Sequence, residues 1–216
     1  MGTIFMVRHG ETVWNVEGRI QGHSDIKLSE KGRQQAQALA RRLSDVTFDA
    51  AYCSDLSRTT ETGQIILEGR SVPLQRTPEL REYNKGVFEG LTAQEYKAKY
   101  PDLYEASLVN DLDFAPTGGE TIRQASARMG AFIGGVQRQH PEGTTLIVGH
   151  GGSLRAAIVA LLALPLEANW KFAMGICALS VIATYPTNAV LHLYNDTSHL
   201  NGLTQEVCYV RVPTKE

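Results

Sequence analysis

The stretch Val7-Arg8-His9-Gly10 decides how the rest of the chain is interpreted. The residues that lead into it, 4–7, form an apolar run that is too short for a helix and long enough for one buried strand. The run stops at an arginine, a histidine and a flexible glycine. Because open α/β folds bind their ligands at the carboxyl edge of the sheet, Arg8 and His9 are candidates for a functional site.

A second stretch of the chain has the same design. Residues 144–148 form another short apolar run, which ends in Gly149-His150-Gly151 ahead of a helix-like segment. A single histidine after a strand is more often an ordinary loop residue than a catalyst. Two histidines in matching contexts favour the other interpretation, in which both imidazoles reach one edge of the same sheet.

The order of the expected elements predicts the fold class. Strands and helices alternate through residue 164, which predicts an α/β fold: a three-layer α/β/α sandwich with a mostly parallel sheet. Two late apolar runs predict a hairpin that adds an antiparallel edge strand, and a segment in the tail is expected to add another edge strand. The expected strands are 4–7, 48–53, 72–76, 144–148, 178–184, 189–194 and 207–212, and the expected helices are 29–43, 54–68, 92–109 (broken at Pro101), 120–139 and 153–164.

Local signals place some helix ends. Ser29 is expected to cap one helix, and Ser54 or Asp55 is expected to cap the helix after the second strand. Arg58 would then lie in a first turn, where free amide groups and the helix dipole favour an anion, although surface arginines are often only solvated. Residues 13–25 are rich in Gly, Asn, Gln and Ser and are expected to form a loop over the strand ends.

Length and composition set the remaining bounds. A chain of 216 residues predicts one domain, with residues 83–118 as an insertion over the sheet edge. The 21 basic and 23 acidic residues give a net charge of -2, so no nucleic-acid or membrane partner is expected. No signal peptide or membrane-spanning run is expected. Three widely spaced cysteines predict reduced thiols in a cytoplasmic protein, with Cys53 and Cys177 in the core.

The candidate side chains together suggest one kind of chemistry. Two arginines and two histidines around a helix terminus form a site of the size of a phosphoryl dianion. A neutral imidazole can attack phosphorus and form a phosphohistidine, and a carboxylic acid can protonate the departing alkoxide. The residues themselves leave open whether that acid is Glu79 or Glu82.

The chain resembles the histidine phosphatase superfamily, the phosphoglycerate mutase-like proteins. The resemblance covers residues 3 to about 164, and the matching blocks occur in the family's order: 8–12, 14–15, 18–22, 54–58, 80–82, 88–90, 118–121 and 148–155. It implies that His9 is the nucleophile that becomes phosphorylated. It also implies that Arg8, Arg58 and His150 bind the phosphoryl group and that Glu82 is the proton donor.

The resemblance implies a supporting set of polar groups as well. Hydrogen bonds to the substrate are expected from Asn15, Gln21, Gly22 and the amide of Gly151, and no metal or other cofactor is expected. For His23, substrate contact and a place on the loop surface are equally favoured. The remaining histidines are expected to be structural, with one of them as a helix cap: His140, His192 and His199.

Hydrolysis is favoured over phosphoryl transfer between two substrate positions. Residues 101–118 contain no Arg or Lys and carry Asp102, Glu105, Asp111 and Asp113, which disfavours a second phosphate site. Residues 18–22 are also more similar to the phosphatase branch of the family. The prediction is a phosphatase for small-molecule phosphate monoesters, with Tyr83, Lys85, Phe88 and residues 92–118 around the leaving group.

Three alternatives stay open at this point. A cofactor-dependent phosphoglycerate mutase, or an enzyme of mixed activity, would use the same nucleophile. A metallohydrolase would use His9 and His150 as ligands, but two neighbouring arginines repel a cation. A non-catalytic phospholigand-binding module would share the fold. A homodimer formed through an edge strand near the C-terminus is also open.

Overall fold

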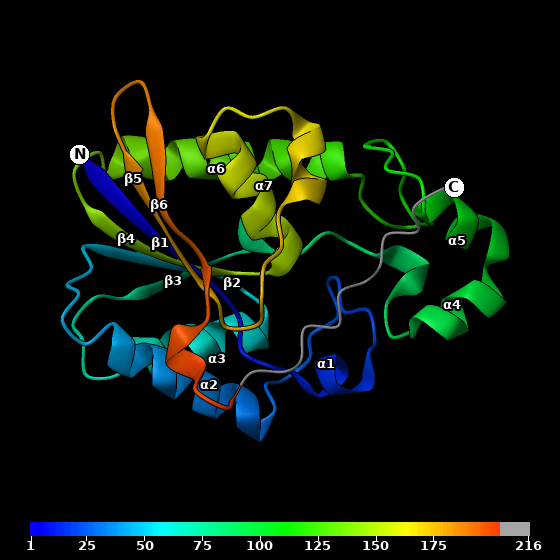
Figure 1. Cartoon of the computed structure of the whole chain (residues 1–216), viewed down its shortest axis with the longest axis horizontal. Helices are drawn as coiled ribbons and strands as arrows, with labels where there is room; N and C mark the ends of the chain where they lie inside the picture. The colour runs from blue at the N-terminus through cyan, green and yellow to red at the C-terminus, as the bar shows by residue number, and fades with distance from the viewer. Residues whose placement is uncertain (204–216) are drawn as a thin grey trace.

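A six-stranded mixed sheet is the centre of the molecule. The computed structural model describes residues 1–203, and the strand order among them is β3-β2-β4-β1-β5-β6 (Figure 1). Four neighbouring strands are parallel: β3 (Leu74–Thr77), β2 (Ala50–Ser54), β4 (Thr144–Gly149) and β1 (Gly2–Arg8). These carboxyl ends therefore lie at one edge.

The expected hairpin continues the sheet beyond β1, on the side away from β4. It consists of β5 (Leu179–Thr184) and β6 (Ala189–Asp196), which pair antiparallel to one another. β5 also pairs antiparallel to β1, so β5 is the strand that runs against the others. The strand expected at residues 207–212 lies outside the described residues.

Helices cover both faces of the sheet, which confirms the three-layer sandwich. α2 (Glu30–Arg42) and α3 (Ser57–Ile66) lie on one face, and α6 (Ile122–Gln139) and α7 (Gly151–Leu161) lie on the other (Figure 1). Along β1, Met6 belongs to the core cluster under α6 and α7, whereas Val7 belongs to the cluster under α2 and α3. Burial on both faces explains why the strands are apolar throughout.

The cysteines follow their prediction as far as the chain is described. Cys53 and Cys177 are buried free thiols in the cluster under α2 and α3. His140 is the C-cap of α6, as expected. No helix within the described residues has both the length and the apolar character needed to cross a membrane.

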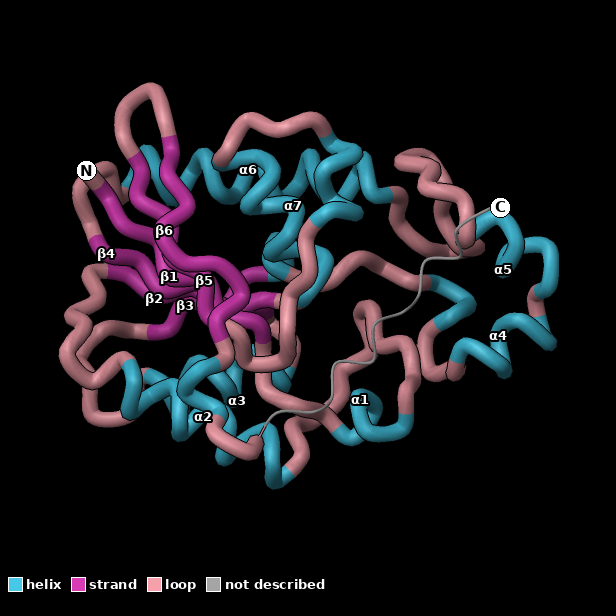
Figure 2. Tube along the Cα trace, in the orientation of Figure 1, coloured by secondary structure: helices cyan, strands magenta, loops and turns pink. Residues whose placement is uncertain are grey.

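Three further helices lie outside the sandwich. They are α1 (Val13–Glu17), α4 (Ala93–Lys99) and α5 (Pro101–Ser107), and the 3-10 turns are Pro78–Leu80, Gly86–Phe88, Leu166–Lys171 and Ser198–Leu200. Figure 2 shows α4 and α5 at the end of the molecule farthest from the N-terminus. Pro101 is the first residue of α5, so the predicted break is confirmed.

The expected loop at residues 13–25 is wrong in its first part, which is helical. Thr12 accepts a hydrogen bond from the Asn15 amide, and the Asn15 side chain accepts one from the Thr12 amide, so a capping box starts α1. Gly18 ends it in the left-handed region, with a φ of 68°. A five-residue helix is too short to show helical periodicity, so only its caps could have revealed it.

The expected cap of α3 is also wrong. The N-cap is Leu56, without a side-chain hydrogen bond, because the two polar candidates have other partners. Ser54 is the last residue of β2, and Asp55 accepts two hydrogen bonds from Arg81, at 2.7 and 2.6 Å. Arg58 nevertheless falls in the first turn, as predicted. The other helix and strand ends lie within three residues of the expected ones, and several coincide with them.

Candidate active site

The two glycine-flanked histidines meet at the carboxyl edge of the sheet. His9 directly follows β1 and His150 directly follows β4, and these strands are neighbours with Arg8 paired to Gly149. The His9 amide donates to the Gly149 carbonyl at 3.0 Å. The ring centroids are 5.2 Å apart, and both residues are buried. Parallel pairing in this register therefore fixes the distance between the imidazoles.

A cavity of about 170 Å³ opens between these rings and the loops above them. The site residues expected from the sequence line this cavity, with the exception of Gly151: Arg8, His9, Asn15, Gln21, Gly22, Arg58, Glu82 and His150. Arg19, Ile20 and Lys85 also line it. Gly151 is the first residue of α7, next to the Arg8 guanidinium. Glu79 is exposed and does not line the cavity, so the geometry favours Glu82 between the two acids.

Hydrogen bonds assign the tautomer of His9. Its Nδ1 lies 2.7 Å from the carbonyl oxygen of Gly10. A carbonyl oxygen only accepts, so Nδ1 must carry the proton and Nε2 must hold the free electron pair. This is the protonation pattern that a nucleophilic imidazole requires.

His150 has the opposite tautomer. Its Nδ1 lies 3.1 Å from Nε of Arg58, which only donates, so Nδ1 accepts and Nε2 carries the proton. Within the described residues, the buried Nε2 of His150 has no hydrogen-bond partner. The pair therefore offers one electron pair and one N–H donor across a short distance.

Both imidazoles are held neutral. Burial, followed by the positive charge of Arg58, lowers the pKa of His9 well below its usual 6.5, and the nearby Arg8 acts in the same direction. The pKa of His150 is lowered well below 6.5 by the same causes, with His9 as a further contributor. A neutral His9 keeps its electron pair in mildly acidic solution.

This neutrality predicts a pH dependence of stability. In the unfolded chain both histidines bind protons near pH 6.5, whereas in the fold they do so only at lower pH. Above about pH 6.5 both histidines are neutral in the folded and in the unfolded state, so no stability is lost through their protonation. Below it, the free energy of unfolding should fall by up to roughly 1.4 kcal/mol per pH unit for each histidine.

Urea unfolding between about pH 7.5 and about pH 5.5 measures this effect. The His150→Gln variant should show a shallower decline than the wild type. His192→Gln, which changes an exposed histidine of β6, should keep the wild-type decline. Equal slopes in all three proteins would contradict the neutral assignment.

Arg58 holds three parts of the site together. Besides His150, it donates from Nη1 to the Ser24 carbonyl at 2.7 Å and from Nη2 to the Gly22 carbonyl at 2.8 Å. Burial lowers the pKa of Arg58 to about 10, so the group is still cationic at neutral pH. A buried cation bonded only to neutral acceptors is suited to receiving an anion.

Arg8 supplies a second cation to the cavity. Its Nη1 donates to the Met174 carbonyl at 2.6 Å, and its buried Nε has no hydrogen-bond partner in the described part of the chain. Burial lowers the pKa of Arg8. Oxygen Oε1 of Gln21 is also buried and unpartnered within residues 1–203. Within the described residues, the cavity thus has several polar atoms without a hydrogen-bond partner.

Glu82 lies on the N-terminus of α7. Its carboxylate accepts hydrogen bonds from the amides of Gly152 at 2.9 Å, Ser153 at 3.0 Å and Tyr83 at 2.9 Å. Burial acts to raise the pKa of Glu82, but these hydrogen bonds and the charges of Lys85 and Arg155 outweigh it, and the pKa is lowered. This carboxylate is therefore ionised at neutral pH.

One residue that sequence reasoning did not single out joins two loops of the site. The Glu89 carboxylate accepts from the His23 and Ser24 amides, each at 2.8 Å, from the Ser24 hydroxyl at 2.6 Å, and from the Lys85 amide at 3.1 Å. Gly22 adopts a φ of +53° against this side chain, which leaves no room for a Cβ. Glu89 lies in the block 88–90 that matches the family, but its position in the sequence did not indicate what it contacts.

His23 has an internal role that neither expectation described. Its Nε2 lies 2.9 Å from the carbonyl oxygen of Glu82, so the ring donates a hydrogen bond to the backbone of the proposed acid. It does not line the cavity. Nor does the structure place any group of three or more His, Cys, Asp or Glu residues suited to a metal ion within residues 1–203.

Fold and site together define a class of α/β protein in which paired neutral imidazoles and buried arginines surround a phosphoryl-sized cavity. Residues 4–197 match the histidine phosphatase superfamily (branch 1), and the chain belongs to that family. It is 32% identical over 200 residues to phosphoserine phosphatase 1 of Hydrogenobacter thermophilus, covering 93% of this chain and 95% of that protein.

Two further relatives agree with this assignment. The metal-independent phosphoserine phosphatase of Arabidopsis thaliana is 33% identical over 93% of this chain and 84% of that protein. The crystal structure of the alpha-ribazole phosphatase from Shigella flexneri superposes with a TM-score of 0.85 at 33% identity, covering 90% of this chain and 96% of that one. The phosphoglycerate mutase-like fold is therefore shown.

Proposed function

We propose that the protein hydrolyses small-molecule phosphate monoesters through a phosphohistidine formed on His9. The observation that carries this proposal is the opposite tautomers of the two buried imidazoles. His9 presents an electron pair, as a nucleophile must, while His150 presents an N–H that stabilises a phosphoryl oxygen. Family membership and the phosphatase names of the relatives support the same activity.

The first step transfers the phosphoryl group to the protein. Nε2 of His9 attacks phosphorus, the bond to the ester oxygen breaks, and the leaving alkoxide takes a proton from Glu82. Charge on the equatorial oxygens is balanced by Arg8 and Arg58, which are fixed before the substrate arrives. Water then attacks the phosphohistidine, with Glu82 as the base, and phosphate is released.

Glu82 must gain its proton when the substrate binds. A phosphoryl dianion beside the carboxylate is a like charge, which raises a carboxyl pKa. Asn15 and Gln21 are proposed to donate hydrogen bonds to the phosphoryl group. The Asn15 oxygen is already bonded to Thr12, which leaves its amide nitrogen as the donor, and Gln21 reaches the same role by a flip of its amide. The amides of Gly22 and Gly151 complete the proposed donors.

A change at Glu82 tests the assignment of the acid. We expect Glu82→Gln to lower kcat/KM for alkyl phosphates by roughly 10²-fold or more, because alkoxides need a proton to leave. The loss with p-nitrophenyl phosphate should be much smaller, since its phenolate leaves without one. The value of kcat/KM isolates this step, because it reports events up to phosphohistidine formation. Glu79→Gln is the matched control, and equal losses on both ester types in Glu82→Gln would remove Glu82 from the role.

Residues 83–118 are proposed to act as an insertion that covers the site and shapes the leaving-group pocket. A second cavity, lined partly by Tyr83, Lys85 and Phe88, supports this proposal. Two further parts of the proposal are independence from metal ions, supported by the metal-independent relative from Arabidopsis thaliana, and a cytoplasmic setting, supported by two buried free thiols.

Assays on the purified protein test hydrolysis against its alternatives. We expect release of phosphate from p-nitrophenyl phosphate and from alkyl phosphates, unchanged by a chelator. A phosphoglycerate mutase assay, run with and without a bisphosphate primer, should give little turnover by comparison. Loss of activity with the chelator would favour a metallohydrolase, dominant mutase turnover would favour that alternative, and binding without turnover would favour a non-catalytic module.

A further inference from the structure

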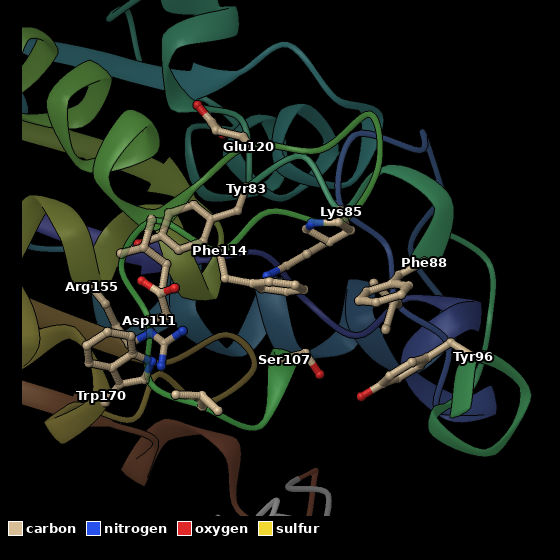
Figure 3. A pocket seen from close by; sticks show the side chains of 14 residues that line it. Tyr83, Lys85, Phe88, Tyr96, Ser107, Asp111, Phe114, Glu120, Arg155 and Trp170 are labelled. Carbon is tan, nitrogen blue, oxygen red and sulfur yellow. The ribbon is translucent and has the colours of Figure 1, made fainter. Parts of the chain in front are cut away.

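A second cavity adjoins the phosphoryl site. It has a volume of about 360 Å³, a size typical of small-molecule sites, and it shares Ile20 and Lys85 with the inner cavity. Figure 3 shows the Lys85 side chain reaching toward the middle of this outer cavity, with Arg155 and Trp170 on one side and Phe88 and Tyr96 on the other. A leaving group attached to phosphorus in the inner cavity would extend into this space.

Two cations on the wall of the outer cavity, Lys85 and Arg155, act on the Glu82 carboxylate through space and lower its pKa, but they are not in a salt bridge with it. No carboxylate within residues 1–203 forms a salt bridge with Lys85 or Arg155. Arg155 donates to two carbonyl oxygens of the described chain, those of Gly151 at 3.2 Å and Phe172 at 3.4 Å. The Lys85 ammonium lies over the Tyr83 ring at 5.3 Å. Partly buried cations that form no salt bridge are suited to binding an anionic ligand.

The charges around the cavity suit a single negative charge. Glu120 also lines the cavity, but Arg128 neutralises it through a salt bridge of 2.8 Å. Asp111, an exposed residue at the margin, offsets one of the two free cations. The lining residues alone carry two cations and two acids, and Arg128, which lies outside the lining, adds one positive charge to this balance. A dianionic second phosphoryl group would exceed it, whereas a carboxylate matches it.

We propose that Lys85 and Arg155 bind a carboxylate carried by the leaving group, so that the preferred substrates are phosphate monoesters of hydroxy acids. This inference rests on the hydrolytic function proposed above and names the substrate class of that site. Lys85 lies at the boundary of the two cavities and contacts the carboxylate nearest the ester. Arg155 holds its outer oxygen through the guanidinium N–H groups that do not bond to the backbone.

Matched esters in the wild-type protein give the first test. O-phosphoserine and O-phosphoethanolamine differ only in a carboxylate, and 3-phosphoglycerate and glycerol 1-phosphate differ by a carboxylate in place of a hydroxymethyl group. We expect kcat/KM to be roughly 10-fold or more higher for the acid in each pair. Ratios near one would overturn the inference. Faster turnover of propane-1,3-diol bisphosphate than of the acids would reassign the cations to a second phosphoryl group and also overturn it.

Variants then locate the preference. Lys85→Gln and Arg155→Gln come from different elements, and each should lower the acid-to-neutral ratio roughly 10-fold, mainly through KM for the acid. The matched controls are Lys99→Gln and Arg138→Gln, which change exposed cations that do not line the cavity. A ratio that both cavity variants leave intact would overturn the assignment. Hydrolysis of p-nitrophenyl phosphate that depends on His9 tests the proposed phosphatase function independently of the carboxylate preference. If this hydrolysis is absent, the phosphatase function itself is contradicted.

Discussion

The His9→Ala variant should lose turnover by at least roughly 10⁴-fold, because the variant lacks the imidazole that presents a free electron pair in the cavity. His150 cannot substitute, since its exposed nitrogen carries the proton. The variant should also lose any phosphoprotein that is labile in acid and stable in base. Steady-state hydrolysis of p-nitrophenyl phosphate and labelling with a radioactive phosphate ester measure the two effects.

Binding should survive in this variant. When His9 is shortened, Arg8 and Arg58 keep their backbone partners and His150 keeps its hydrogen bond from Arg58, so inhibition by phosphate should change by no more than about 10-fold. His192→Ala is the matched control, because it removes an exposed imidazole from β6. Retention of both turnover and the labile phosphoprotein in His9→Ala would end the proposal of a phosphohistidine.

The Arg58→Lys variant should lose phosphate binding despite keeping the charge. Arg58 is fully buried and serves three acceptors from one planar group: His150, Ser24 and Gly22. A single ammonium cannot reproduce this fork, so at least one buried acceptor is left without a donor. We expect kcat/KM to fall roughly 10²- to 10³-fold, and the free energy of unfolding to fall by roughly 1–3 kcal/mol.

Inhibition constants for phosphate and vanadate, measured beside urea unfolding, separate binding from stability in this variant. Arg41→Lys, at an exposed position on α2, should behave as the wild type in both measurements. Inhibition constants that stay unchanged in Arg58→Lys, in a protein that is folded, would count against the phosphoryl site as described.

Residues adjacent to strand ends were the predictable part of the site. Arg8, His9 and His150 directly end or follow short apolar runs, and parallel strands deliver such residues to one edge whatever the loops do. Arg58 was placed in its first turn although the expected cap was wrong, because the strand before it limits where the helix can begin. Glu82 required the family resemblance, since Glu79 and Glu82 look alike in the sequence.

The missed residues act through contacts that spacing does not show. Glu89 accepts four hydrogen bonds from residues on two loops, and His23 bonds to the backbone of the acid. Residues 101–118 lack basic side chains, as noted from the sequence, but cations reach the outer cavity from residue 85 and from α7. Only packing brings these distant segments to one wall.

The sequence by itself determined the sandwich, the edge of the sheet that carries the site and the identity of its histidines and arginines. Periodicity and strand ends depend on local physics, which a single chain displays directly. The tertiary structure alone decided the tautomers of His9 and His150, the position of Glu82 at the start of α7 and the placement of Lys85 and Arg155 on one cavity wall. Each of these depends on which donor or acceptor lies within about 3 Å, and that distance is set by packing between segments far apart in the chain.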